Sequence, residues 1–119
     1  MEIRNLDRHN MCAEYGVLTQ RLLPWSQLTP PFEGAWAVLE PGASTTPHAH
    51  HECEIFIAVS GTATISSDGA VSPFVAGDTA YLPPGETHQI VNVGDGDFRM
   101  YSVWWDAQMT ERFFSAATG

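Results

Sequence analysis

The chain has 119 residues, of which 44% are hydrophobic, and this composition is typical of one globular domain spanning residues 1–119. Fourteen acidic residues against five arginines, with no lysine, give a net charge of -9, which disfavours binding to nucleic-acid phosphates. The absence of lysine also excludes a lysine Schiff base and the lysine of a phosphate-binding P-loop.

The N-terminal third of the chain predicts strands separated by a proline-rich loop. The first ten residues are polar and charged and contain no apolar signal region, so we expect a cytoplasmic protein without a membrane segment. Residues 11–23 alternate weakly and favour a strand. Prolines at 24, 30 and 31 indicate a loop that carries Trp25. The apolar residues 35–39 predict a further strand, ending at the Pro41-Gly42 turn.

Short strands follow one another through the rest of the chain. The predicted strands are 54–59, 62–66, 71–75, 79–82, 87–93 and 98–105. The run at 54–59 is apolar after Glu54, which is typical of a strand buried on both faces. Pro73 indicates an edge strand or a bulge, and Asp106 could cap a short helix through Phe114. The pattern predicts an all-β sandwich or barrel, with this helix after its last strand.

Two histidine-containing stretches in the middle of the chain indicate a metal site. His48, His50 and Glu54 lie in the first stretch and His88 in the second. On a strand, His48 and His50 would point to the same side because side chains repeat every two residues. Three imidazoles and one carboxylate suit a divalent ion such as Zn, Fe, Mn, Ni or Co. We therefore predict that these four residues bind one such ion.

Both stretches resemble the motifs of the cupin family. Gly42, His48, His50, Glu54 and Gly61 follow the pattern G-x5-H-x-H-x3-E-x6-G, and Gly77, Pro83, Gly85, His88 and Asn92 follow G-x5-P-x-G-x2-H-x3-N. The resemblance implies a single cupin jelly-roll β-barrel with its core at about residues 34–105. It does not fix the reaction, because one fold can host many unrelated functions.

A reaction at such a metal needs an acid or base within hydrogen-bond reach of the substrate. Tyr81, Tyr101 and Glu40 are the catalytic candidates. Further aromatic candidates for the pocket wall are Trp36 and either Trp104 or Trp105. Cys53 is expected to face away from the side that Glu54 faces, because neighbouring residues on a strand point in opposite directions.

The leading interpretation is an enzyme that uses its metal as a Lewis acid on a small polar or amino-acid-derived metabolite. Residues 47–52 and 103–106 show a fainter resemblance to the cupin modules of hydrazine-forming synthetases, in which a zinc cupin helps to form an N–N bond. The amino-acid-activating domain of that family would here have to be a separate enzyme. An isomerisation is equally compatible with the site.

Two other functions remain open at this point. One is a non-haem iron dioxygenase, and the other is a non-catalytic cupin that binds or senses a ligand. In each case the partner is a small molecule. We also expect a homodimer, because small single-barrel cupins commonly pair and an isolated jelly roll has sheet edges to cover.

Overall fold

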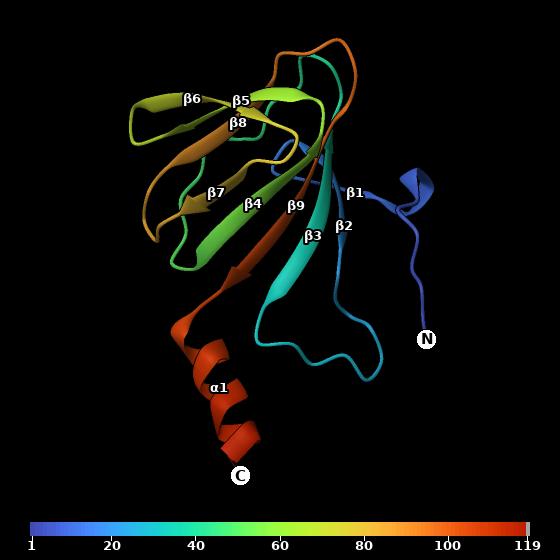
Figure 1. Ribbon diagram of the computed structural model, residues 1–119, viewed down its shortest axis with the longest axis vertical. Coiled ribbons are helices and arrows are strands. Elements are labelled where there is room, and N and C mark those ends of the chain that lie inside the picture. Colours follow the sequence, from blue (N-terminus) through green and yellow to red (C-terminus); the bar gives the residue numbers. More distant parts are fainter. Residues whose placement is uncertain (119) are drawn as a thin grey trace.

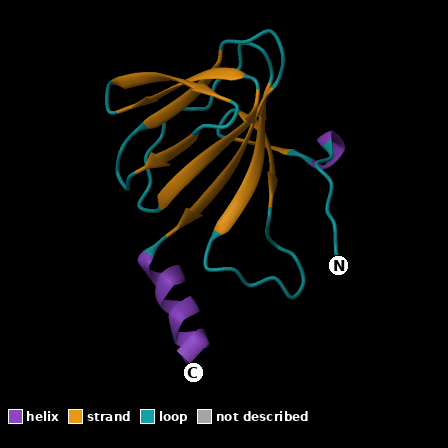
Figure 2. Cartoon of the chain, viewed as in Figure 1, coloured by secondary structure: helices purple, strands orange, loops and turns teal. Residues whose placement is uncertain are grey.

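Alternating apolar residues and Gly- or Pro-containing turns build nine strands, and these strands form two sheets (Figures 1 and 2). The computed structural model describes residues 1–118, with side chains to residue 115. The strands are β1 (Cys12–Glu14), β2 (Val17–Arg21), β3 (Glu33–Leu39), β4 (Cys53–Ser60), β5 (Thr62–Ser67), β6 (Ala70–Val75), β7 (Thr79–Leu82), β8 (His88–Asn92) and β9 (Phe98–Trp105). A short 3-10 helix, η1 (Arg8–Asn10), precedes them and helix α1 (Ala107–Thr118) follows.

The two sheets share one core. The larger sheet has the strand order β1-β2-β3-β9-β4-β7, and the smaller one has the order β6-β5-β8. Leu39, Phe56 and Phe98 of the larger sheet pack with Phe74 and Ile90 of the smaller sheet in a single buried cluster. The predicted all-β architecture is confirmed. The expected edge strand with Pro73 is also confirmed, because β6 lies at the edge of its sheet.

The N-terminal strand prediction needs a correction. Residues 11–23 do not form one strand, because Tyr15 and Gly16 both have positive φ angles, of 52° and 83°, and reverse the chain. Their turn joins β1 to β2 as an antiparallel hairpin in which Glu14 pairs with Val17. Two residues of positive φ are the usual geometry of a tight hairpin turn. The hairpin places Glu14 close to the residues of β2.

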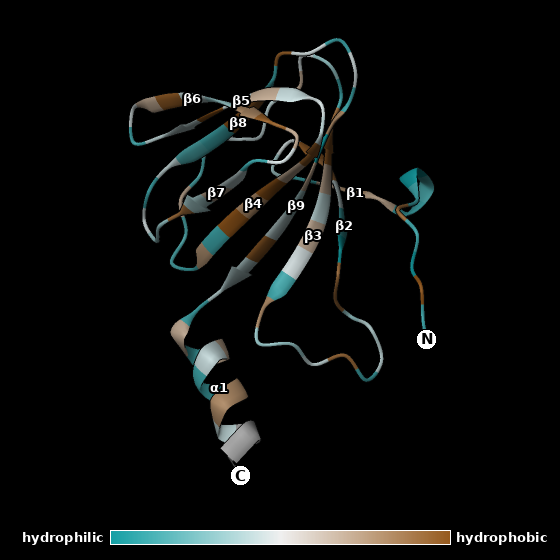
Figure 3. Ribbon diagram, in the orientation of Figure 1, coloured by the Kyte–Doolittle hydropathy of each residue, from teal (hydrophilic) through white to brown (hydrophobic). Residues whose placement is uncertain are grey.

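Strand β4 differs from its prediction in one respect. Its inward residues Phe56 and Ala58 are buried, but Ile57 and Val59 on the other face are 37% and 45% exposed. The strand is therefore apolar on both faces and buried on one. Figure 3 shows the hydrophobic colour continuing along β4. The outer face of β4 therefore exposes the apolar side chains of Ile57 and Val59.

The C-terminal helix begins where the sequence predicts it. Asp106 accepts a hydrogen bond from the backbone N–H of Met109 at 2.9 Å, which caps the first turn of α1. The helix continues beyond the predicted end at Phe114, to Thr118. It extends away from the sheets in Figure 1. Within the described chain, no helix has the length and apolar character that crossing a membrane would require.

Candidate metal centre

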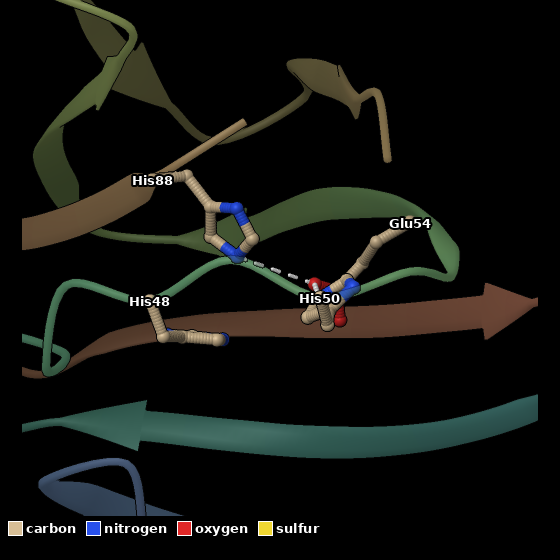
Figure 4. Close-up of side chains that lie close together, drawn as sticks. All are labelled: His48, His50, Glu54 and His88. Atoms are coloured by element: carbon tan, nitrogen blue, oxygen red, sulfur yellow. Dashed lines mark hydrogen bonds and ion pairs between the residues drawn. The ribbon is translucent and has the colours of Figure 1, made fainter. Parts of the chain in front are cut away.

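The four predicted ligands come together in space, from two different parts of the fold (Figure 4). Glu54 lies on β4, and His88 is the first residue of β8. His48 and His50 precede β4 in a segment outside the strands, which meets β8 through two isolated bridges, Ser44 with Val91 and His48 with His88. The prediction that both histidines lie on a strand is therefore wrong, because this segment bends towards the smaller sheet. The second bridge is what brings His48 and His88 together.

The distances between ligand atoms suit a single ion. All four side chains offer atoms that lie within 4.8 Å of one another. The Oε1 atom of Glu54 is 3.0 Å from His50 Nε2 and 3.4 Å from His88 Nε2. Two atoms bound to one ion at about 2.1 Å are about 3.0 Å apart at a right angle and about 3.4 Å apart at the tetrahedral angle. These separations match neighbouring ligands of a first-row metal.

Backbone carbonyls fix the orientation of all three imidazoles. The Nδ1 atoms of His48, His50 and His88 lie 2.7, 3.0 and 3.2 Å from the carbonyl oxygens of Thr46, Glu52 and Glu86, respectively. A carbonyl can only accept, so Nδ1 carries the proton in each ring. The Nε2 lone pairs are then directed into the site. Hydrogen bonds of this kind orient metal-ligating histidines in proteins.

The carboxylate of Glu54 is held from its other side by Ser102. The Ser102 hydroxyl donates a short, buried hydrogen bond to Glu54 Oε2, which leaves Oε1 for the histidines. Burial by itself would raise the pKa of Glu54, but the neighbouring His88 and His50 rings and the Ser102 hydroxyl together hold that pKa below its usual range. Burial lowers the pKa of His48. The site therefore favours an ionised Glu54 carboxylate beside a neutral His48 imidazole, which are the states that bind a metal.

The surroundings of His88 Nε2 indicate whether a cation fits at this site. His88 Nε2 is buried and has no hydrogen-bond partner among the residues that the structure describes. A buried nitrogen without a partner costs free energy, so such atoms are rare in native proteins. Figure 4 marks the 3.4 Å contact of His88 Nε2 with Glu54 Oε1, but Nδ1 carries the proton of this ring, so Nε2 has no hydrogen to donate to the carboxylate. A metal ion between these side chains would satisfy it, so the residues present fit a bound divalent ion.

The metal centre opens into a pocket of about 210 Å³. The small side chains of Ala35 and Ala37 on β3 line it and leave space above the larger sheet. Tyr15, from the β1–β2 turn, also lines the pocket and stacks on His48 with ring centroids 4.3 Å apart. Glu14 of β1 and Thr19 and Arg21 of β2 add polar and charged side chains to the pocket lining. The pocket can hold a small molecule next to the ligand set.

None of the three catalytic candidates lines this pocket. Tyr81 is 58% exposed. Tyr101 precedes Ser102 on β9, so it points to the opposite face of the sheet from Ser102. Glu40 forms an exposed ion pair with Arg8 at 3.0 Å. Their catalytic role stays a prediction.

The aromatic prediction for the pocket wall holds for Trp104, which lines the pocket, whereas Trp36 and Trp105 do not. Sequence reasoning missed Ser102, Tyr15 and Arg21, all of which do line it. For Tyr15 and Arg21, the sequence signal that could have predicted this placement is the Tyr15-Gly16 turn. A hairpin there places Tyr15 at the turn and puts the alternate residues of β2, including Arg21, on one face.

Comparison with known proteins identifies the family. The cupin domain model matches residues 35–104, which is more than half of the chain. The chain is a cupin. This identification agrees with the barrel-like arrangement of its two sheets and with the sequence motifs.

Two solved structures match nearly the whole chain. A cupin 2 conserved barrel domain protein from Salinispora arenicola CNS-205 is 53% identical, with a TM-score of 0.90 and coverage of 98% of both chains. The plu4264 protein from Photorhabdus luminescens is 35% identical, again with a TM-score of 0.90 and 98% coverage of both chains. The cupin fold is therefore shown over almost the full length of this chain.

A curated relative is similar over a shorter stretch. The oxalate-binding protein of Thermotoga maritima is 35% identical over 66 residues, which make up 55% of this chain and 54% of the relative. The matched stretch thus spans about half the length of that protein. Its name describes what the Thermotoga protein binds.

Proposed function

We propose that this cupin is a metal-dependent enzyme that acts on a small polar or amino-acid-derived metabolite. The orphaned Nε2 of His88, buried beside Glu54 and two further histidines, is the observation that supports the proposal most directly. A divalent ion bound there would supply Lewis-acid polarisation of a substrate oxygen. An isomerisation, or a rearrangement such as N–N bond formation, would use this chemistry without a change of oxidation state.

The side chains around the ligands would perform the remaining tasks. Ser102 and the carbonyls of Thr46 and Glu86 hold the ligating side chains in place before any ligand enters. Phe56 and Met100 line the inner part of the pocket and exclude water from it. Glu52 also lines the pocket, and its carboxylate could act as the acid or base in place of Tyr81, Tyr101 and Glu40. Its Oε1 lies 3.6 Å from His50 Nδ1.

A second candidate function is binding without turnover. It is favoured by the placement of Tyr81, Tyr101 and Glu40 outside the pocket, and by the name of the oxalate-binding relative. The non-haem iron dioxygenase remains a third reading, because the ligand set also suits iron. Both alternatives share the metal centre with the leading proposal and differ in what happens to the ligand.

Metal analysis of the purified protein tests the shared part of these proposals. We expect about one transition-metal ion per chain in the wild type and almost none in His88→Ala, which removes a buried ligand. His9→Ala is the matched control, because His9 is exposed and lies outside the cluster. Equal metal content in the wild type and His88→Ala would contradict the assignment.

A further inference from the structure

We propose that Arg21 is the anchor for a carboxylate group of the ligand, and that the pocket takes a short carboxylate carrying a second oxygen donor at its other end. The inference rests on the proposed function, because that second donor would meet the metal centre. Arg21 is the only cationic side chain other than histidine among the described residues that line the pocket.

Strand register places Arg21 opposite the metal centre. Arg21 pairs with Ala35, Ala35 pairs with Ser102, and Ser102 pairs with Phe56, so one row runs from β2 through β3 and β9 to β4. All four residues line the pocket. Three strand spacings separate the two ends of this row, or about 14 Å between backbones. At the two ends of the row, Phe56 is buried beside the metal ligands and Arg21 lies at the solvent-exposed rim of the pocket.

The middle of that row is open because Ala35 and Ser102 have small side chains. Ala35 lies in the row itself, and Ala37 occupies the equivalent position in the next row, where it pairs with Thr19. The pocket volume of about 210 Å³ corresponds to roughly seven water molecules at about 30 Å³ each. A molecule of this size that reaches both Arg21 and the metal centre has polar groups at its two ends and only a few atoms between them.

The guanidinium is already oriented for a second partner. Glu14 accepts from its Nε at 3.2 Å and from its Nη2 at 2.8 Å, and Thr19 donates to Glu14 at 2.7 Å. The Arg21 guanidinium carbon also lies 5.5 Å from the centre of the Trp104 ring. These contacts leave Nη1 without a hydrogen-bond partner in the part of the chain that the structure describes. An N–H of Nη1 and the second N–H of Nη2 are then available as the parallel pair of donors through which arginine binds carboxylates.

Glu14 limits how strongly an anion is attracted. Its charge neutralises that of Arg21, so recognition relies on directed hydrogen bonds more than on net charge. This gives two distinct expectations. Removing the guanidinium should weaken carboxylate binding, whereas Glu14→Gln should strengthen it, because glutamine can still accept from Arg21 but no longer repels the ligand. Glu14 is a positioning residue in this scheme, and Arg21 touches the ligand.

Calorimetric titration of the zinc-loaded protein with oxalate, glycolate, malonate and lactate tests the proposal. We expect Arg21→Met to bind the best of these about 10- to 100-fold more weakly, which is the usual effect of losing a hydrogen bond to a charged group. Arg21→Lys should fall between Arg21→Met and the wild type, because lysine keeps the charge without the paired donors. Glu14→Gln should bind several-fold more tightly. Arg99→Met, which removes an exposed arginine outside the pocket, should equal the wild type.

Metal content, measured on the same samples, separates this inference from the proposed function. Equal zinc in the wild type and Arg21→Met, with weaker carboxylate binding in the variant, supports both. Equal zinc and equal affinity overturns the role of Arg21, as does a zinc-loaded wild type that binds none of the four carboxylates. A wild type that binds no metal overturns the proposed function instead. Arg21-dependent carboxylate binding by that metal-free chain would still support the anchor, and its absence would overturn the anchor too.

Discussion

Ser102→Ala isolates the contribution of one hydrogen bond to the metal centre. The Ser102 hydroxyl is the donor to Glu54 Oε2, and both residues are buried, with 6% and 7% of their surface exposed. Alanine removes this donor and adds no bulk. The buried carboxylate oxygen then lacks its partner, and the carboxylate can rotate away from the histidines.

The size of the effect follows from the charge and burial of Glu54. A hydrogen bond to a charged group contributes about 1.5–3 kcal/mol, and loss of a group that orients a ligand typically costs about 10- to 100-fold in metal affinity. We expect Ser102→Ala to fall in that range. Ser102→Thr keeps the hydroxyl and should recover most of the affinity.

Competition with a chelator of known zinc affinity measures the dissociation constant in each variant. Ser72→Ala is the matched control, because the Ser72 hydroxyl is exposed and donates only to the carbonyl of Pro73. It should equal the wild type. A zinc affinity of Ser102→Ala within twofold of the wild type would refute the reasoning, because it would show that Glu54 keeps its orientation without the hydroxyl.

Four further predictions concern stability, assembly and reaction class. At a free metal concentration of 100 times Kd, metal binding stabilises the folded state by about 2.7 kcal/mol. Removing the metal with a chelator should therefore lower the melting temperature by about 10 °C. A fall of less than about 2 °C in a protein shown to bind metal would contradict this prediction. Turnover of an identified substrate should proceed with zinc and without oxygen, and a requirement for both Fe(II) and O₂ would restore the dioxygenase reading. We propose a homodimer in which a second copy covers the outer apolar face of β4, so light scattering should give about twice 13.0 kDa for the wild type and about 13.0 kDa for a variant with Ile57→Asp and Val59→Asp; a monomeric wild type would rule this out. Hydrogen bonding to Arg21 lowers the pKa of Glu14, so their pair stabilises the fold above the usual glutamate pKa and loses that contribution as the pH falls through the lowered value. Denaturant unfolding should therefore give a free energy of unfolding that is higher for the wild type than for Glu14→Gln at pH 6, by less than about 1 kcal/mol, and this difference should vanish towards pH 3. A difference that does not change with pH would contradict the pairing.

The local features of this protein were predictable from its sequence. Strand positions from β3 to β9 follow from runs of apolar and β-branched residues that end at Gly, Pro or Asp, and these are short-range signals. The ligand set follows from residue type and spacing, because a three-histidine, one-carboxylate group is a chemical pattern that can be recognised before its geometry is known. The cap at Asp106 is a local signal of the same kind.

Only the tertiary structure decided which face each residue presents and which distant residues share the pocket. A shift of one residue in strand register moves every side chain to the other face, so sequence alone could not distinguish the outward Tyr101 from the inward Ser102. The exposure of Ile57 depends in the same way on which face of the larger sheet the smaller sheet covers. Arg21 lies across the pocket from the metal centre because β2, β3, β9 and β4 pair in that order, and pairings between distant segments leave no local mark on the sequence.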